Sequence, residues 1–402
     1  MRTDIVGALR GTAAGAIAEE VLGACVHCGM CNSVCPTYRL TGDELDGPRG
    51  RIYLIKQALE GQPIGPLTQN HLDRCLECRA CEPACPSGVE YHRLLDIGRG
   101  FVSTKVPRAT HERLERWAVR VAAAHPGLLA AVFAAGRALR FVLPARLVAN
   151  IPPARPAGRW PTKRHARRML ILGGCVQRAA AGRFNAATAR VFDRLGVTLV
   201  ERRGCCGAVP FHLGADKQAK AMVRRQIDAW DASLDAGFEA IVVNASGCAA
   251  FIRDWPDLLA EHADYVEKAR RIVAHLKDPI EVLTSSPIAG ARAPVAARIA
   301  VHDPCTLRNG PGLGGAVEKL LSGLGYEVTP AADPSQCCGS AGAYSLFQPE
   351  LANRLRDERI TALTAGEPTA IHTANIGCWM HLSAVSPVPV RHWIEAVDDL
   401  IC

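Results

Sequence analysis

Two cysteine runs near the N-terminus constrain the fold of this 402-residue chain more than any other feature. The first run reads Cys25-Val-His-Cys28-Gly-Met-Cys31-Asn-Ser-Val-Cys35-Pro36. The second repeats the spacing as Cys75-Leu-Glu-Cys78-Arg-Ala-Cys81-Glu-Pro-Ala-Cys85-Pro86. Both follow Cys-x2-Cys-x2-Cys-x3-Cys-Pro, so eight thiols and two prolines recur at fixed intervals.

This spacing is typical of proteins with two [4Fe–4S] clusters, in which the first three cysteines of a run hold one cluster and the fourth ligates the other. We therefore expect cluster 1 on Cys25, Cys28, Cys31 and Cys85, and cluster 2 on Cys75, Cys78, Cys81 and Cys35. The candidates to balance the cluster charge are Arg49, Arg51, Arg74 and Arg79. A pair of zinc sites is the alternative, although zinc sites usually combine two Cys-x2-Cys units.

About forty residues separate the two runs, and they show a helical period. In residues 48–60 the apolar positions are Ile52, Ile55, Ala58 and Leu59. The arrangement resembles the α-helical ferredoxin domain in the iron–sulfur subunits of succinate dehydrogenases and related oxidoreductases.

The composition and the first residues predict that the chain stays in a compartment where thiols are kept reduced. Residues 1–10 lack the basic and then apolar run of a secretory signal, and residues 368–390, the longest stretch without charged residues, contain histidine, asparagine and proline. We expect a cytoplasmic protein, with peripheral attachment to the inner face of the cell membrane as a further option. Its seventeen cysteines then indicate metal or redox chemistry instead of disulfides. The net charge of +8 is not concentrated in a basic block, so we expect no nucleic-acid partner.

The middle of the chain predicts two helices over residues 110–147, broken at His125-Pro126. The second helix is apolar but carries Arg137, Arg140 and Arg146, as amphipathic helices do. Packing between domains and docking on a partner or a membrane surface both remain open for it. Residues 151–168 are rich in proline and basic side chains and predict a linker.

The second half is an internal duplication. Cys175 and Cys305 lie 130 residues apart, the Cys-Cys-Gly tripeptides at 205 and 337 lie 132 apart, and Cys248 and Cys378 lie 130 apart. In each copy, strand-like runs (240–243 and 369–373) alternate with helical runs (215–230 and 346–363), which favours a mainly parallel sheet. Because the cysteines follow strands, each copy would gather four of them beyond the carboxyl ends of its sheet.

The predicted fold is therefore an α-helical ferredoxin-like domain followed by a duplicated α/β cysteine-rich domain with mainly parallel sheets. We expect the ferredoxin domain in residues 1–105, a helical connector and linker in 106–168, and the two cysteine-rich domains in 169–290 and 291–402.

Two Cys-Cys-Gly repeats behind a two-cluster domain resemble the iron–sulfur subunits of bacterial glycolate oxidases. The resemblance includes His302-Asp-Pro-Cys-Thr-Leu307, Cys337-Cys-Gly-Ser-Ala-Gly342 and Arg391-His-Trp393. It implies an electron-transfer subunit without a catalytic residue of its own, partnered by FAD-containing hydroxy-acid dehydrogenase subunits. Those subunits would oxidise glycolate to glyoxylate, and this chain would relay electrons toward a quinone or another membrane-linked acceptor.

Heterodisulfide reductases and lactate-utilisation proteins carry the same repeat. The former add a Cys-x-x-Cys pair, which this chain lacks because Phe251 and His381 stand three residues after Cys248 and Cys378. An additional iron–sulfur site is expected at Cys305, Cys337, Cys338 and Cys378 in preference to Cys175, Cys205, Cys206 and Cys248, while Cys402 stands alone. For these cysteines the alternatives are zinc binding, thiol–disulfide chemistry at Cys337-Cys338, or a structural role. For the chain as a whole, the alternative is an iron–sulfur subunit of a D-lactate dehydrogenase.

Overall fold

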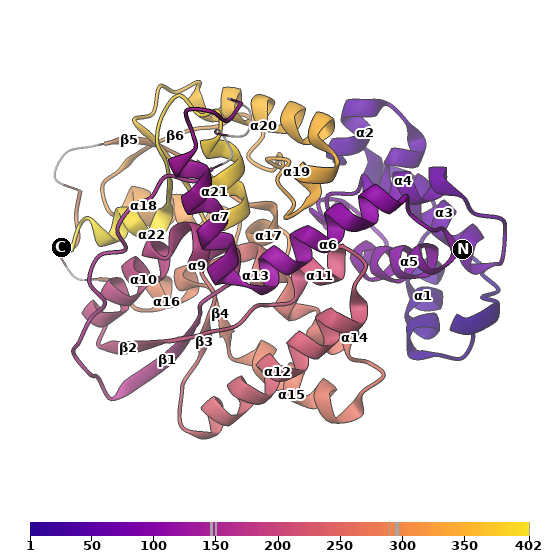
Figure 1. Cartoon of the computed structure of the whole chain (residues 1–402), viewed down its shortest axis with the longest axis horizontal. Helices are drawn as coiled ribbons and strands as arrows, with labels where there is room; N and C mark the ends of the chain where they lie inside the picture. The colour runs from indigo at the N-terminus through magenta and orange to yellow at the C-terminus, as the bar shows by residue number, and fades with distance from the viewer. Residues whose placement is uncertain (145–147, 149–150, 289, 294–296, 402) are drawn as a thin grey trace.

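The computed structural model describes residues 1–144, 148, 151–288, 290–293 and 297–401, so that Arg146, Leu147 and Cys402 lie outside the described residues. The N-terminal helical domain, indigo to violet in Figure 1, lies at one end of the molecule, and the two α/β domains make up the rest. The predicted fold class is confirmed.

The N-terminal domain is built from short helices joined by cysteine-bearing loops. Its helices are α1 (Ala13–Ala24), α2 (Pro36–Thr41), α3 (Pro48–Leu59), α4 (Pro66–Asp73) and α5 (Tyr91–Lys105), with 3-10 turns at Gly7–Leu9, Met30–Asn32 and Glu44–Asp46. Three of the helices begin with proline at their first position, where no intrahelical N–H bond is lost. The predicted apolar face of α3 is buried, since Ile55 and Leu59 are completely enclosed between α1, α4 and α5.

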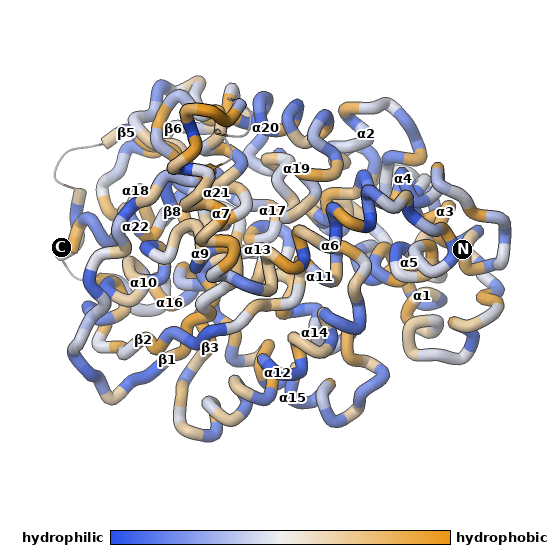
Figure 2. The backbone as a smooth tube through the Cα atoms, viewed as in Figure 1, coloured by the Kyte–Doolittle hydropathy of each residue, from blue (hydrophilic) through white to orange (hydrophobic). Residues whose placement is uncertain are grey.

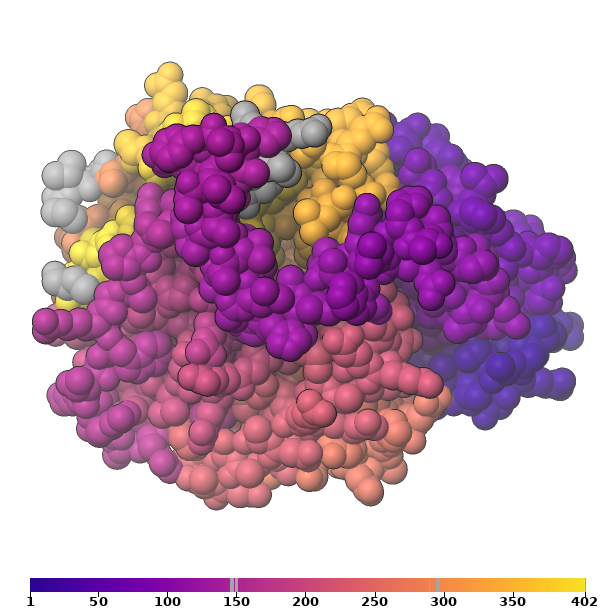
Figure 3. Space-filling model, in the orientation of Figure 1, coloured from indigo at the N-terminus to yellow at the C-terminus, as the bar shows by residue number. Residues whose placement is uncertain are grey.

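Helices α6 (Thr110–Ala124) and α7 (Pro126–Ala138) cross the face of the molecule shown in Figure 3. The predicted break at His125-Pro126 is confirmed, with a bend of 106° between the two helices. Our prediction that the second helix continues to residue 147 was wrong: α7 ends at Ala138, and the chain then turns through Leu139 toward Pro144.

Across the described residues no single helix is long and apolar enough to cross a membrane. The α6–α7 pair reaches that length and composition only when the two bent helices are taken together.

The first α/β domain contains a parallel sheet of order β2-β1-β3-β4. Its strands are β1 (Arg167–Leu172), β2 (Val197–Arg202), β3 (Ile241–Val242) and β4 (Leu276–Lys277). Its helices are α9 (Val176–Ala181), α10 (Arg183–Arg194), α11 (Ala208–His212), α12 (Asp216–Asp235), α13 (Ser246–Arg253), α14 (Trp255–Leu258), α15 (Ala263–Ala274) and α16 (Pro279–Ser285). The central strands are buried on both faces, as a parallel sheet covered by helices requires.

The second α/β domain repeats this topology with the order β6-β5-β7-β8, again parallel throughout. Its strands are β5 (Arg298–His302), β6 (Glu327–Thr329), β7 (Ala370–Thr373) and β8 (Val390–His392). Its helices are α17 (Cys305–Arg308), α18 (Ala316–Gly323), α19 (Tyr344–Phe347), α20 (Pro349–Thr364), α21 (Ile376–Ser383) and α22 (Trp393–Asp398). The shared strand order shows that the sequence duplication is also a structural one.

The two repeats share one apolar core, which joins them into a single body. Phe192 and Leu199 of the first repeat and Trp393 of the second belong to the same buried cluster. Figure 2 shows hydrophobic segments, in orange, in the middle of this body. The carboxyl ends of the two sheets therefore have a fixed position relative to each other.

Candidate functional site

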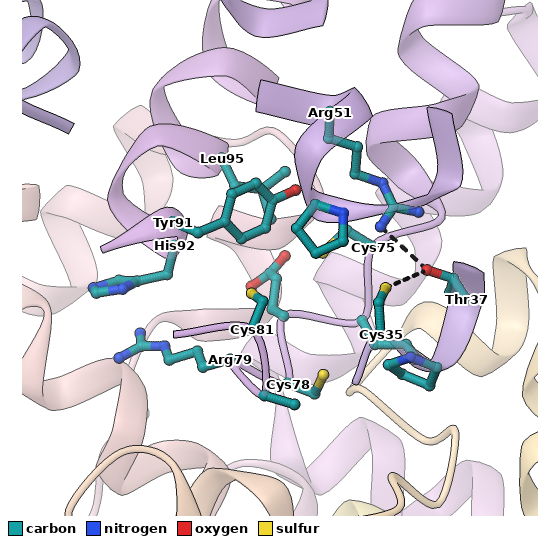
Figure 4. Close-up of a pocket in the computed structure, with 15 residues that line it drawn as sticks. Cys35, Thr37, Arg51, Cys75, Cys78, Arg79, Cys81, Tyr91, His92 and Leu95 are labelled. Atoms are coloured by element: carbon teal, nitrogen blue, oxygen red, sulfur yellow. Dashed lines mark hydrogen bonds between the residues drawn. The ribbon is translucent and has the colours of Figure 1, made fainter. Parts of the chain in front are cut away.

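The structure brings Cys35 of the first run together with Cys75, Cys78 and Cys81 of the second run around one hollow (Figure 4). Cys35 is the residue before α2, and the first residues of α2 and α3 line the same hollow as the second run. A second hollow is lined by Cys25, Cys28 and Cys31 together with Cys85, the last cysteine of the other run. Each hollow thus contains three thiols of one run and the fourth of the other.

The two hollows have a common wall, since Cys81, Pro48 and Tyr91 line both. Cys81 and Tyr91 are buried, and Tyr91 begins α5 beneath the second run. Groups bound in the two hollows would therefore be close neighbours.

Matching positions in the two runs have the same left-handed backbone. His27 and Glu77 have φ of 59° and 54°, and Gly29 and Arg79 have φ of 85° and 55°. Three of these residues are not glycine, and each costs about 1–2 kcal/mol in this conformation. Strain retained at equivalent positions of both runs indicates that the loop shape itself is required, as at ligand-binding loops.

Burial strongly affects the thiols around the hollow of Figure 4. It raises the pKa of Cys78 and Cys81 well above the usual value, and it also raises the pKa of Cys75. These thiols would stay protonated at neutral pH unless a bound metal replaced the protons. In the other hollow, burial together with Cys25 and Cys85 raises the pKa of Cys31 to about 11.

Arg51 is the predicted compensator that the structure places best. It is 1% exposed, lines the hollow, and donates to Thr37 Oγ1 at 3.1 Å and to the carbonyl oxygen of His71 at 2.7 Å. Burial is the largest single influence and lowers the pKa of Arg51, but Cys75, Tyr91, Cys35 and Asp46 together outweigh it, so that the pKa is raised. A fixed positive charge therefore stands beside the second cysteine set.

The other three predicted arginines are tied to carboxylates. Arg49 lines the first hollow and pairs with Glu44 at 2.6 Å. Arg74 pairs with Asp46 at 2.9 Å and lines neither hollow. Arg79 lines the hollow of Figure 4, but its side chain points away from the cysteines and pairs with Asp254 of the first α/β domain.

Sequence reasoning missed Arg99, which donates to the carbonyl oxygens of Leu72 and Cys75. Its charge lowers the pKa of Cys75 and partly offsets the effect of burial. No spacing rule would have identified it, because it reaches the loop from the middle of α5.

In each α/β repeat, four cysteines collect where three neighbouring strands end. Cys175, Cys205-Cys206 and Cys248 follow β1, β2 and β3, and Cys305, Cys337-Cys338 and Cys378 follow β5, β6 and β7. The Sγ atoms of Cys305 and Cys337 are 3.9 Å apart. The side-chain amide of Asn375 donates to Cys378 Sγ at 3.4 Å, and the backbone N–H of Gly339 donates to Cys337 Sγ at 3.5 Å.

Steric restrictions explain why each Cys-Cys-Gly tripeptide ends in glycine. Gly207 and Gly339 have φ of 90° and 81°. A Cβ on Gly339 would lie 2.5 Å from the backbone oxygen of Ala352 in α20, and one on Gly207 would lie 2.9 Å from Val223 Cγ2 in α12. Glycine thus allows the cysteine pair to approach the helix that follows it.

The second cysteine-rich site adjoins the N-terminal domain at Cys78. Asn309 donates to the carbonyl oxygen of Cys78 at 2.7 Å, and Cys337 packs in one apolar cluster with Leu76. The side chains of Cys78 and Cys305 also pack against this cluster. The cysteine-rich site of the second repeat therefore lies next to the hollow that contains Cys78.

His302 and Arg359 were not predicted as site residues. The imidazole of His302 and the sulfurs of Cys338 and Cys378 have donor atoms within 4.8 Å of one another. Burial, with Arg359 and Arg308, holds the pKa of His302 well below its usual value, so the ring is neutral. The signal in the sequence was the histidine of His302-Asp-Pro-Cys305, which has no counterpart before Cys175.

Fold and cysteine arrangement together define a class of iron–sulfur protein that joins a dicluster domain to two cysteine-rich domains. Residues 21–89 match the family described as 4Fe-4S dicluster domain, and residues 169–253 and 299–383 match the family described as Cysteine-rich domain.

Similar proteins narrow this class further. The chain is 46% identical to the glycolate oxidase iron-sulfur subunit of Escherichia coli K12, over 100% of this chain and 99% of that protein. It is 31% identical to a probable glycolate oxidase iron-sulfur subunit of Bacillus subtilis, over 90% of this chain and 89% of that protein. Lactate utilization protein A of Bacillus licheniformis is 24% identical, with 53% of this chain and 91% of that protein covered. The chain belongs to the glycolate oxidase iron–sulfur subunit family.

Proposed function

We propose that this chain is the electron-transfer subunit of a glycolate-oxidising complex and holds two [4Fe–4S] clusters on its eight N-terminal cysteines. Cluster 1 would be bound by Cys25, Cys28, Cys31 and Cys85, and cluster 2 by Cys75, Cys78, Cys81 and Cys35. The observation that carries the proposal is the pair of adjoining hollows, each lined by three thiols of one run and the fourth of the other.

When bound, such clusters accept and release single electrons. The residues of this chain would hold them close together across the wall formed by Cys81 and Tyr91, with Arg51 balancing charge beside the second set. A partner subunit carrying FAD would perform the substrate chemistry and oxidise glycolate to glyoxylate, because clusters alone offer no hydride chemistry. This chain would then be a non-catalytic member of the complex.

The proposed route continues into the second α/β repeat. Cys305, Cys337, Cys338 and Cys378 form the preferred additional iron–sulfur site, since Cys305 packs in the same cluster as Cys78. The corresponding site of the first repeat, at Cys175, Cys205, Cys206 and Cys248, is the weaker candidate because Leu172 and Ile227 occupy the positions that correspond to His302 and Arg359.

The electron acceptor is proposed to be a quinone, reached from the membrane surface through α6 and α7. The exposed apolar side chains of this segment are Leu114, Trp117, Leu128, Val132, Leu139, Phe141 and Val142, and the last two are 83% and 77% exposed. Figure 3 shows the segment, in purple, across the outside of the molecule, and Figure 2 shows hydrophobic stretches along α7. Arg113 and Arg140, both exposed, provide positive charge that suits anionic lipid at the cytoplasmic face.

Vesicle binding tests this attachment. Phe141→Asp with Val142→Asp should reduce co-sedimentation with vesicles of mixed neutral and anionic lipid, because each substitution places a carboxylate in the apolar surface. Leu67→Asp is the matched control, since Leu67 is 76% exposed but lies on α4 in the N-terminal domain. Equal binding by the double variant and wild type would contradict membrane attachment through this segment.

The relay itself is tested by removing one predicted ligand from each run. Cys28→Ser and Cys78→Ser should each abolish one cluster signal and interrupt reduction of the acceptor, while glycolate still reduces the flavin of the partner subunit. Ser33→Ala is a control in the same loop, since the hydroxyl of Ser33 is exposed and donates to the carbonyl oxygen of Met30. Electron flow to the acceptor in both cysteine variants would overturn the relay.

The hydroxy acid is proposed to be glycolate, with D-lactate as the competitor because of the similarity to lactate utilization proteins. The partner flavoprotein determines this choice, so the co-purified complex should be assayed with both acids. Faster flavin reduction by D-lactate than by glycolate would assign the chain to a D-lactate dehydrogenase complex instead.

A further inference from the structure

The two cysteine-rich sites differ in the residues that surround their thiols. His302 ends β5 three residues before Cys305, and Leu172 ends β1 three residues before Cys175. Arg359 stands twenty-one residues after Cys338, and Ile227 stands at the same distance after Cys206. All four side chains are at least 97% buried. The second repeat therefore encloses an imidazole and a guanidinium group where the first encloses two aliphatic side chains.

His302 is oriented by its neighbour on β7. His302 pairs with Thr373 in the parallel register, and its Nδ1 lies 2.9 Å from Thr373 Oγ1. Its Nε2 is buried and has no hydrogen-bond partner among the described residues. When Nδ1–H donates to the hydroxyl, Nε2 carries a bare lone pair, the usual arrangement of a metal-binding histidine held by a second hydrogen bond.

The ring of His302 lies beside two sulfurs. One of its nitrogens and the sulfurs of Cys338 and Cys378 lie within 4.8 Å of one another, as ligands of one centre would. Because Thr373 engages Nδ1, Nε2 is the nitrogen that remains available as a ligand. A buried polar atom without a partner is costly in a folded protein, and a metal ligand bond would remove that cost.

Arg359 adds charge compensation at the same place. It is completely buried, donates through Nη1 to the carbonyl oxygens of Ala332 and Asp333, and leaves Nε and Nη2 without a partner among the described residues. This cation would stabilise a thiolate at Cys338, whose charge acts on Arg359 together with those of Asp333 and Asp303.

We propose that His302 is a ligand, through Nε2, of a metal centre that Cys338 and Cys378 also ligate in the second cysteine-rich domain. The inference rests on the additional site of the proposed function but not on the two N-terminal clusters. Iron in a cluster and a single zinc ion share this mixed thiolate and imidazole chemistry. For a cluster, an imidazole in place of a thiolate raises the reduction potential, which would make this centre an electron acceptor for the N-terminal pair.

Four anaerobically purified full-length proteins test the proposal: wild type, His302→Leu, His302→Cys and His381→Gln. His302→Leu introduces the residue of the first repeat. His302→Cys keeps a metal ligand at the position. His381→Gln is the control, because His381 lies on α21 with Cys378 but its ring bonds the carbonyl oxygen of Ala352.

We expect wild type and the control to contain metal beyond the roughly eight irons of two cubanes, and His302→Leu to lose that excess while keeping the eight. With 15N-histidine, pulsed electron paramagnetic resonance of an iron centre, or X-ray absorption of a zinc centre, should show a nitrogen ligand that His302→Leu and His302→Cys both lack. An iron centre should also have a lower potential in His302→Cys than in wild type.

If His302→Leu keeps the metal in excess of eight irons and its spectrum is unchanged, then His302 is not a ligand, although the additional metal site exists. Wild type without any excess metal would overturn both. The N-terminal cluster signals report folding in every variant, so that neither outcome can be confused with failure of the two N-terminal clusters.

Discussion

Gly339→Ala is expected to destabilise the protein through two separable effects. Gly339 has φ of 81°, and the new Cβ would lie 2.5 Å from the backbone oxygen of Ala352 and 3.0 Å from Leu355 Cβ. The left-handed conformation costs alanine about 1–2 kcal/mol, partly offset by about 0.4–1 kcal/mol from restricting the unfolded chain. Displacing a buried helix to admit the methyl group adds about 1–3 kcal/mol.

Gly312→Ala isolates the first effect. Gly312 is in the same domain with φ of 73°, and nothing lies within 4 Å of its Cβ position. Gly339→Ala should therefore be less stable than Gly312→Ala by about 1–3 kcal/mol, which corresponds to an apparent melting temperature lower by about 2–12 °C.

Anaerobic circular dichroism melts at one scan rate provide the measurement, because unfolding of a cluster protein is not a reversible two-state process. Melting temperatures within one degree of each other for the two variants would refute the steric explanation of the Cys-Cys-Gly glycine.

Three further predictions concern ligands, charge and pH. Cys35→Ser should remove the same cluster signal as Cys78→Ser; loss of the signal that Cys28→Ser removes would contradict the exchanged fourth ligands. Arg51→Met should cost roughly 3–5 kcal/mol in unfolding free energy, since it leaves the completely buried Asp46 with fewer partners. It should also lower the reduction potential of cluster 2, because a positive charge is lost, and Arg51→Lys should lower it less. Equal potentials in wild type and Arg51→Met would count against the charge effect. Burial raises the pKa of Asp278 to about 7, so its stabilising contribution, complete below the ordinary carboxyl pKa, is lost as pH rises through 7. Wild type should therefore lose stability relative to Asp278→Asn between about pH 4 and pH 7, and a constant difference between their melting temperatures would be evidence against this.

Local patterns predicted most of the architecture because they follow from short-range chemistry. The proline after His125 marks the break between two helices, the apolar period over residues 48–60 marks a buried helix, and strands alternating with helices lead to parallel sheets. The end of α7 was missed because the composition of residues 139–144 remains apolar while the backbone turns. Apolar composition alone does not fix where a helix stops.

Residues that reach a site from distant elements could not be predicted in the same way. Arg99 acts on the Cys75 loop from α5, and Arg359 reaches the Cys338 loop from α20, so each depends on how a helix packs against the loop. His302 is an intermediate case. Comparison of the two repeats residue by residue would have shown that His302 corresponds to Leu172. Only the structure shows that its Nε2 is unpaired and that its ring lies beside two thiols.

The central claim is that electrons from glycolate pass through clusters bound by this chain. Freeze-quenched electron paramagnetic resonance of the anaerobic complex with its flavoprotein partner, before and after addition of glycolate, tests it most directly. We predict that reduced [4Fe–4S] signals appear after glycolate is added, that Cys28→Ser and Cys78→Ser each remove a different one of them, and that the total iron is at least about eight per chain. A reduced flavin without any reduced cluster signal, or a chain that binds zinc in place of iron at its eight N-terminal cysteines, would contradict the account.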